Sequence, residues 1–366
     1  MSVAWYFALP LFGAALLVAC DKGQREPQPS APLTTDKARS APAPPAPAPP
    51  VAEEMPAVEV VCERSAATPV PPADFADDSE SAGLKGCSAE DSYYGIDVAV
   101  DYARARKCAL GAKRPDGSPS LVSADVLMMI YANGRGVPAN YDLALRFACR
   151  ADGAPAELGG RVSRLWKARA GEKWSTPFDQ CDDATSGLLL GYCSELKERI
   201  NASARKARLR SATTGMPERE LKALQATAQR YFEARSTKEV DQSGSLRQSM
   251  EVSERGHLND EFARALEQLK EPAFVPPNGD ARALDAEVNE LLARAATCAG
   301  LDKGKQPLPG LINSSGIKET QQSWRAYRKA FVSLALKLHA GSTAEAWSAW
   351  LTQPRLVQLR ELIAGC

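Results

Sequence analysis

Apolar residues recur every three or four positions along most of the chain beyond Asp77, which is the spacing of amphipathic α-helices. Residues 102–111, 123–133 and the stretch after Asn140 show this pattern, and each of them ends at or beside a glycine. Asparagine is a strong helix N-cap and glycine is a common helix stop. No segment shows the two-residue alternation of a half-buried strand. The pattern predicts an almost entirely α-helical fold.

The N-terminus carries an apolar stretch of a different kind. Residues 3–18 are almost wholly apolar, which is too short for a membrane-spanning helix but has the length of a signal-peptide core. The stretch ends in Leu17-Val18-Ala19-Cys20, and a polar run starts directly behind it. This ending resembles the lipobox of bacterial lipoproteins, although no basic residue precedes the apolar core. An ordinary secretory signal is the alternative.

The lipobox resemblance implies how the chain is processed and where it resides. Residues 1–19 are expected to be removed as a signal peptide, and Cys20 is expected to carry lipid at the new N-terminus. The lipid then anchors the protein to the inner or outer membrane of the cell envelope, facing the periplasm.

Proline, alanine, serine and threonine dominate the chain from Glu26 to about Pro72. Such a segment lacks apolar periodicity and cannot bury enough surface to offset its ordering entropy. Proline also favours the extended polyproline II conformation. We therefore expect a disordered tether over residues 20–76 that holds a folded body away from the membrane.

A helix–turn–helix between residues 124 and 151 carries a recognisable motif. Its turn reads Asn133-Gly134-Arg135-Gly136-Val137, and the small Ala144 and Ala148 come next on the second helix. The motif resembles the Sel-type repeat, a short relative of the tetratricopeptide repeat, and residues 93–109 look like a degenerate neighbouring unit. The resemblance implies a block of helical hairpins over residues 77–172 that binds proteins or peptides. One and a half repeats are few for a solenoid, so we expect this block to pack on the region C-terminal to it.

The region over residues 173–366 contains an internal echo. The set Gln229, Tyr231 and Arg235 has the same spacing as the set Gln322, Trp324 and Arg328, offset by 93 positions. A Gly-Ser pair stands behind each set before another helix begins. Two diverged copies of one helical unit, at about 178–270 and 280–366, explain the echo and predict a duplicated helical bundle.

The same region resembles the LprI-type lysozyme-inhibitor family of small helical envelope proteins, over about half of the chain. The matching positions are the early pair Cys181 and Cys193, the Gln-x-x-Trp-x-x-x-Arg-like segment over 321–328, and Arg355 with Leu359 near the end. A cysteine that often comes after the Trp/Arg segment in the family is replaced at Phe331 or its neighbours, so a family disulfide there must be rerouted through Cys298 or Cys366. The resemblance implies inhibition of lysozyme-like glycosidases.

The cysteine count agrees with an exported protein. If Cys20 carries lipid, eight cysteines remain, and an even number in an oxidising compartment predicts disulfides. We predict the pair Cys181–Cys193, because it would close a short loop between helix ends. We also predict Cys87–Cys108, because it would join the two arms of the degenerate repeat. The pairing of the other four stays open at this point: Cys62, Cys149, Cys298 and Cys366.

Aromatic residues supply the candidate contact positions. Trp324, Tyr327 and Phe331 lie at helical spacing, with Arg328 one turn after Trp324 and able to lie on its ring. Trp347 and Trp350 belong to a later helix, for which Ser342 and Glu345 suggest a capping box. An aromatic recognition surface is the functional interpretation of these residues. Helix core is the interpretation we favour, because aromatic stripes at this spacing are normally buried.

Composition narrows the classes of function. Lys plus Arg and Asp plus Glu are equal at 45 each, so no net positive charge recruits nucleic acid. Only two histidines occur, His257 and His339, and no Cys-x-x-Cys pair, Walker-type loop or His-Glu-x-x-His motif accompanies them. We therefore expect no metal, no cofactor and no enzymatic activity.

These observations lead to one main prediction and one alternative. The chain is expected to be a membrane-anchored binding protein of the cell envelope that inhibits a lysozyme-type muramidase by steric blocking. The alternative is an envelope scaffold that binds other proteins through its helical repeats.

Overall fold

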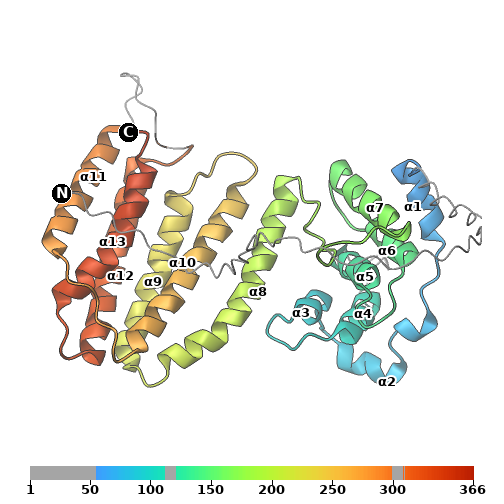
Figure 1. Ribbon diagram of the computed structural model, residues 1–366, viewed down its shortest axis with the longest axis horizontal. Helices are drawn as coiled ribbons and strands as arrows, with labels where there is room; N and C mark the ends of the chain where they lie inside the picture. The colour runs from blue at the N-terminus through green and yellow to red at the C-terminus, as the bar shows by residue number, and fades with distance from the viewer. Residues whose placement is uncertain (1–54, 112–120, 299–307, 309) are drawn as a thin grey trace, which may run out of the picture. The chain divides into compact units, whose positions relative to one another are not determined.

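The computed structural model describes residues 55–111, 121–298, 308 and 310–366. The regular secondary structure of these residues is helical, so the predicted all-α fold is confirmed (Figure 1). The helices are α1 (Val58–Ala66), α2 (Asp78–Ser81), α3 (Ala89–Tyr94), α4 (Tyr102–Gly111), α5 (Leu121–Asn133), α6 (Tyr141–Ala148), α7 (Pro155–Arg169), α8 (Gly187–Thr213), α9 (Glu218–Lys238), α10 (Arg247–Lys270), α11 (Ala281–Cys298), α12 (Ser314–Leu338) and α13 (Ala344–Leu362). None of the described helices is long and apolar enough to cross a bilayer.

Helix α1 corrects the expected extent of the disordered tether. It lies inside the predicted 20–76 segment, packs on α6 and α7, and buries Val61 to 2% exposure. Cys62 of α1 is joined to Cys149. The proline content around α1 concealed the helical spacing of Val58, Val61 and Cys62. The predicted signal peptide, Cys20 and the tether up to residue 54 lie outside the described residues.

The repeat block has its own apolar core, built mainly from α4, α5, α6 and α7. Gly134 and Gly136 have φ values of 63° and 69° in the α5–α6 turn, a left-handed conformation that favours glycine. Asn140 caps α6 by accepting the backbone N–H of Leu143 at 3.0 Å. Phe178, which we assigned to the C-terminal region, packs in this first core instead. The block therefore extends beyond the predicted boundary at residue 172.

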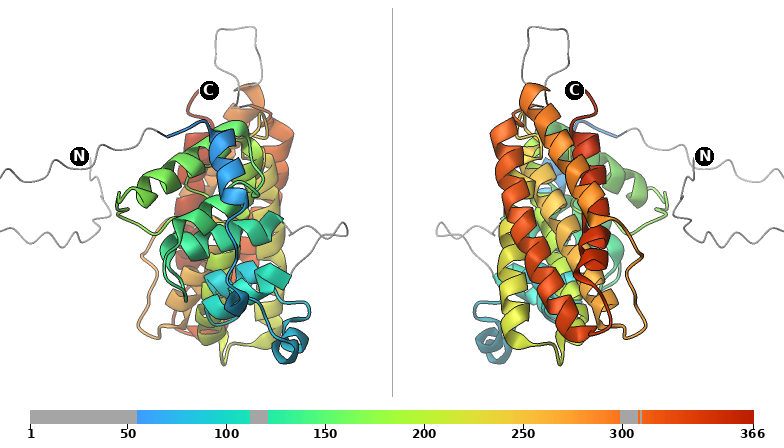
Figure 2. Two further views of the ribbon diagram at one scale, coloured as in Figure 1. Left: turned by 90° about the vertical axis from the view of Figure 1, so that its right-hand side faces the viewer. Right: turned by 90° about the vertical axis from the view of Figure 1, so that its left-hand side faces the viewer.

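The C-terminal region consists of the six helices α8 to α13. Helix α8 packs chiefly on α10, α11 packs chiefly on α13, and α9 packs on α12. The helices coloured yellow, orange and red run side by side (Figure 2). Tyr231 of α9 and Trp324 of α12, which are equivalent positions in the proposed duplication, are both buried. Two apolar clusters form this region, one around Phe331 and Trp347 and one around Leu356 and Cys298.

Four disulfides lie within the described residues. Both predicted pairs, Cys87–Cys108 and Cys181–Cys193, are present. The four cysteines whose pairing was open form Cys62–Cys149 and Cys298–Cys366. Such disulfides indicate an oxidising compartment outside the cytoplasm.

The start of α13 differs from the predicted capping box. Thr343, not Ser342, is the N-cap and accepts the backbone N–H of Ala346 at 3.2 Å. The Ser342 hydroxyl instead accepts the indole N–H of Trp347 at 2.7 Å. A buried indole N–H needs a partner, and this requirement determines the role of Ser342.

Candidate binding site

The aromatic stripe of α12 is part of the core rather than a recognition surface. Trp324 is 2% exposed and Phe331 is fully buried, and Tyr327 stacks on Tyr231 of α9 with ring centroids 5.6 Å apart. The Arg328 guanidinium lies 4.7 Å from the centre of the Trp324 ring, as the spacing predicted. The favoured interpretation as helix core is therefore confirmed for these residues.

The two tryptophans of α13 have the same role. Trp347 is fully buried, and the half-buried Trp350 packs edge-on against Trp347 and against Phe274, with centroid distances of 5.7 Å and 5.6 Å. Neither tryptophan offers a flat exposed ring to a ligand.

Arg355 of α13 is buried in an ionic network. Its terminal nitrogens donate to the Glu239 carboxylate at 2.7 Å and 2.6 Å, and its Nε donates to the side-chain oxygen of Gln321 at 3.0 Å. Burial alone would lower the pKa of Arg355, but the attraction of Glu239 outweighs it and holds this pKa above its usual value. Arg355 is 1% exposed, so it holds α13 to the end of α9 and does not contact a partner.

Arg235 extends this network to α10. It lies one turn before Glu239 on α9 and donates to the Glu239 carboxylate at 2.7 Å, while its Nε lies 2.9 Å from Glu254 of α10. Two arginines and two glutamates thus form a network of ion pairs where α9, α10 and α13 meet. Such a network fixes the local geometry of the three helices.

An open hollow lies over this network. Its volume is about 530 Å³, and it is formed by the end of α9 and the loop after it, the first half of α10, Ile312 shortly before α12, and the end of α13. Its lining residues are Arg235, Glu239, Val240, Asp241, Met250, Ser253, Glu254, Ile312, Gln358, Glu361 and Leu362. We call it the α9–α10 hollow. It combines an apolar surface with several carboxylates.

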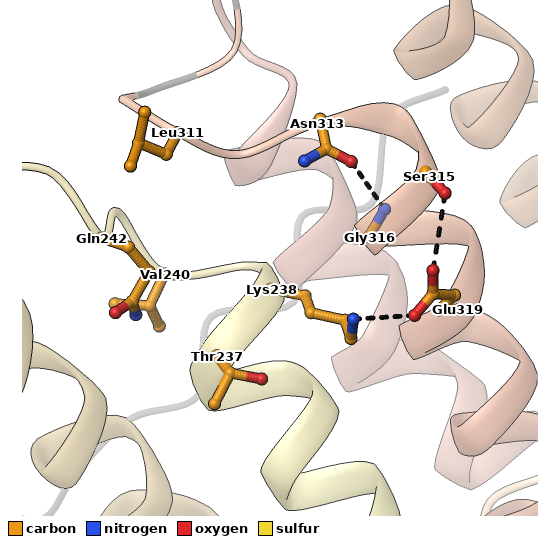
Figure 3. A pocket seen from close by; sticks show the side chains of 9 residues that line it. All are labelled: Thr237, Lys238, Val240, Gln242, Leu311, Asn313, Ser315, Gly316 and Glu319. Carbon is orange, nitrogen blue, oxygen red and sulfur yellow. Dashed lines mark hydrogen bonds and ion pairs between the residues drawn. The ribbon is translucent and has the colours of Figure 1, made fainter.

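A smaller, more polar hollow of about 300 Å³ shares Val240 with it. Figure 3 shows its lining, in which the Asn313 side chain accepts the backbone N–H of Gly316 at 2.9 Å and Lys238 pairs with Glu319 at 2.7 Å. These groups satisfy one another. The smaller hollow thus offers side-chain hydrogen bonds but no uncompensated charge.

Exposed apolar side chains line these two hollows and occur next to them in the sequence. Met250 is 41% exposed in the α9–α10 hollow and Leu311 is 66% exposed in the smaller one. Leu246 lies one turn before Met250 at the start of α10. Leu188 is exposed at the start of α8, where the backbone of its neighbour Gly187 approaches Ser245, the residue before Leu246. Exposed apolar residues that gather in one place are typical of interaction surfaces.

A third hollow, of about 420 Å³, is formed by α8 and α10 and is rich in arginine. Arg205 pairs there with Glu198 and Asp260, and Arg208 pairs with Glu267. These two guanidiniums are therefore already paired, while the third arginine, Arg264, donates to the backbone carbonyl of Asp260 at 3.3 Å.

Helix α3 and the first half of α8 form a polar cluster that the sequence analysis did not predict. The Glu90 carboxylate is 4% exposed and accepts hydrogen bonds from Tyr192 and from Arg199, which also pairs with Asp91. Tyr94 donates to Asp179 at 2.7 Å nearby. The partners lie about 100 residues apart in the chain, so no local pattern signals them.

The Asp125 carboxyl of α5, near this polar cluster, has a strongly shifted pKa. Burial raises the pKa of Asp125 to about 7, against the opposing effect of Arg161 at 3.9 Å. The negative charges of Glu90, Asp152 and Asp179 add to the rise.

This raised pKa predicts a pH-dependent stability. The folded chain binds the Asp125 proton more tightly than the unfolded chain, so the benefit is present below about pH 4 and is lost as pH rises through about 7. We expect the free energy of unfolding to fall by about 2–3 kcal/mol between pH 5 and pH 8 because of this group. Urea denaturation of Asp125→Asn should lack this part of the slope, whereas Asp142→Asn, at an exposed ion pair, should keep it. An unchanged slope in Asp125→Asn contradicts the assignment.

The two histidines do not lie together. His257 is exposed beside Glu261, and His339 lies 2.8 Å from the carbonyl oxygen of Leu269 at the end of α12. The parts of the chain that the structure describes contain no group of three His, Cys, Asp or Glu residues placed to hold a metal ion.

No family model, curated protein or solved structure matches this chain. The resemblances to Sel-type repeats and to the LprI-type family therefore rest on the sequence motifs alone.

Proposed function

We propose that the protein is a binding protein of the cell envelope, anchored to a membrane by lipid on Cys20. Inhibition of a lysozyme-type muramidase, by steric blocking of its sugar-binding cleft, is the most concrete form of this proposal. The observation that carries it is the surface at the end of α9, where exposed apolar residues and carboxylates surround a 530 Å³ hollow. The Cys298–Cys366 disulfide and the buried ionic contacts of Glu239 hold the helices around this surface. A preformed surface loses little conformational entropy on binding, which favours affinity.

The repeat block supports a second candidate, an envelope scaffold that binds proteins through its helical hairpins. Val98 and Val100 are 54% and 51% exposed in the loop between α3 and α4. This loop is held against α8. The Asp97 side chain pairs with Lys206, and the Asp97 backbone N–H donates to the Ser203 hydroxyl at 2.8 Å. A fixed loop with two exposed valines offers a contact point for a partner.

Turnover of cell-wall substrate tests the leading proposal. The chain over residues 21–366 is titrated into C-type, goose-type and endogenous muramidases; it includes α1, because Cys62–Cys149 is part of the fold. We expect dose-dependent inhibition with saturable binding, and the reduced and alkylated chain serves as the control. If no enzyme is bound or inhibited, the inhibitor proposal fails for those enzymes. Co-purification of an envelope protein that is lost in Val98→Asp with Val100→Asp would then support the scaffold.

A further inference from the structure

We propose that the α9–α10 hollow is a docking site for a cationic protein segment, in which lysines or arginines flank an apolar side chain. The inference rests on the proposed function, binding of an envelope protein, and names the site and the chemistry of the partner. It applies to a muramidase and to any other basic partner.

The first part of the argument is the apolar lining. Val240, Met250, Ile312 and Leu362 contribute to the wall of the hollow. Methionine is flexible and polarisable, and it adapts to differently shaped apolar partners. The volume of about 530 Å³ falls within the range of about 300–1,000 Å³ that is typical of ligand sites. An apolar side chain of the partner is therefore the natural occupant of the hollow.

The second part is the charge around that lining. Arg235, Glu239 and Glu254 are already joined to one another, and Arg355 neutralises Glu239 further. Asp241 and Glu361 remain, and neither forms an ion pair with any described residue. Asp241 accepts the backbone N–H groups of Ser243 and Leu311, which hold its pKa below the usual value. Within the described residues, two carboxylates without an ion-pair partner therefore lie at the rim.

Charge also disfavours the other occupants. Phosphates of nucleic acid or of an anionic lipid surface would meet the Asp241 and Glu361 carboxylates, and like charges repel. A second copy that docked the same hollow face to face across a two-fold axis would bring the carboxylates of both copies together. A cationic partner gains attraction at both rim positions, and exposed charge pairs of this kind mainly accelerate association and add specificity.

Peptide binding to the chain over residues 21–366 tests the inference. Fluorescence anisotropy is measured with a labelled peptide in which Leu-Phe is flanked by paired lysines, and with two matched peptides that replace the lysines by glutamates or Leu-Phe by Ser-Ser. We expect saturable binding of the first peptide only, with an affinity that falls as salt rises.

Substitutions in the hollow sharpen the test. Asp241→Asn with Glu361→Gln keeps the side-chain shapes and should weaken binding about tenfold, and Met250→Asp should abolish it. Glu290→Gln with Glu345→Gln removes the same charge from exposed positions outside the hollow and should leave the affinity unchanged. Thermal melts of each variant establish that it is folded.

Two results would overturn the inference. One is equal binding of the acidic peptide, and the other is equal weakening by the Glu290 and Glu345 control. Muramidase inhibition is a separate measurement, so cationic peptide binding without inhibition contradicts the muramidase proposal and retains the docking site.

Discussion

Arg355→Met is expected to lower the free energy of unfolding by about 3–5 kcal/mol, because it leaves a buried carboxylate without its main partner. The Glu239 side chain is fully buried and accepts two hydrogen bonds from Arg355. In this variant Arg235 alone must neutralise Glu239, although it also pairs with Glu254. Equilibrium urea denaturation, followed by circular dichroism, measures the loss.

A matched control lies on the same helix. Arg360 of α13 pairs with Glu287 of α11 at an exposed position, so Arg360→Met should cost about 0–1 kcal/mol. A double variant, Arg355→Met with Glu239→Leu, should recover much of the loss because no unpaired buried charge remains. Equal losses in Arg355→Met and Arg360→Met would show that the buried network adds nothing beyond a surface pair.

The second large effect is expected at the disulfide that holds α1. Cys62 and Cys149 are 87 positions apart, and the entropy of closing so long a loop in the unfolded chain corresponds to about 4 kcal/mol. Cys62→Ala with Cys149→Ala should therefore cost about 4 kcal/mol in urea denaturation and should expose α1 to proteases. Val61, buried beside Cys62, keeps some of the packing of α1.

The shorter disulfide provides the comparison. Cys181 and Cys193 are 12 positions apart, and the same loop argument gives about 3 kcal/mol for their removal. The larger loss is expected at Cys62–Cys149. The reverse order, or no proteolytic sensitivity in α1, would contradict the role assigned to that disulfide.

The elements that obey local rules were predictable from the sequence. The α5–α6 hairpin was predictable because its turn needs left-handed glycine at Gly134 and Gly136 and because Asn140 is a strong N-cap. Cys181–Cys193 was predictable because few residues separate its ends. The burial of the α12 stripe was predictable from its helical spacing.

Features that depend on distant residues were not predictable in this way. Glu157 of α7 accepts the backbone N–H groups of Thr185 and Ser186 and so fixes the start of α8, which nothing in the local sequence indicates. The α9–α10 hollow is formed where four separate segments meet, and its rim carboxylate Asp241 belongs to a loop without periodicity. Helix α1 was missed because the surrounding prolines dominated the composition.

The separation of the apolar clusters has a consequence for how the protein melts. The first cluster ends at Phe178 and the next begins at Leu209. Helix α8, which starts between them in the chain, contacts the repeat block through polar pairs such as Arg199–Glu90 and Lys206–Asp97. The repeat block can therefore lose its order while the two C-terminal clusters persist, and screening of the polar contacts by salt weakens the coupling between these two parts. Calorimetry should resolve two transitions that move apart as ionic strength rises. A single melting temperature would then describe neither half of the molecule.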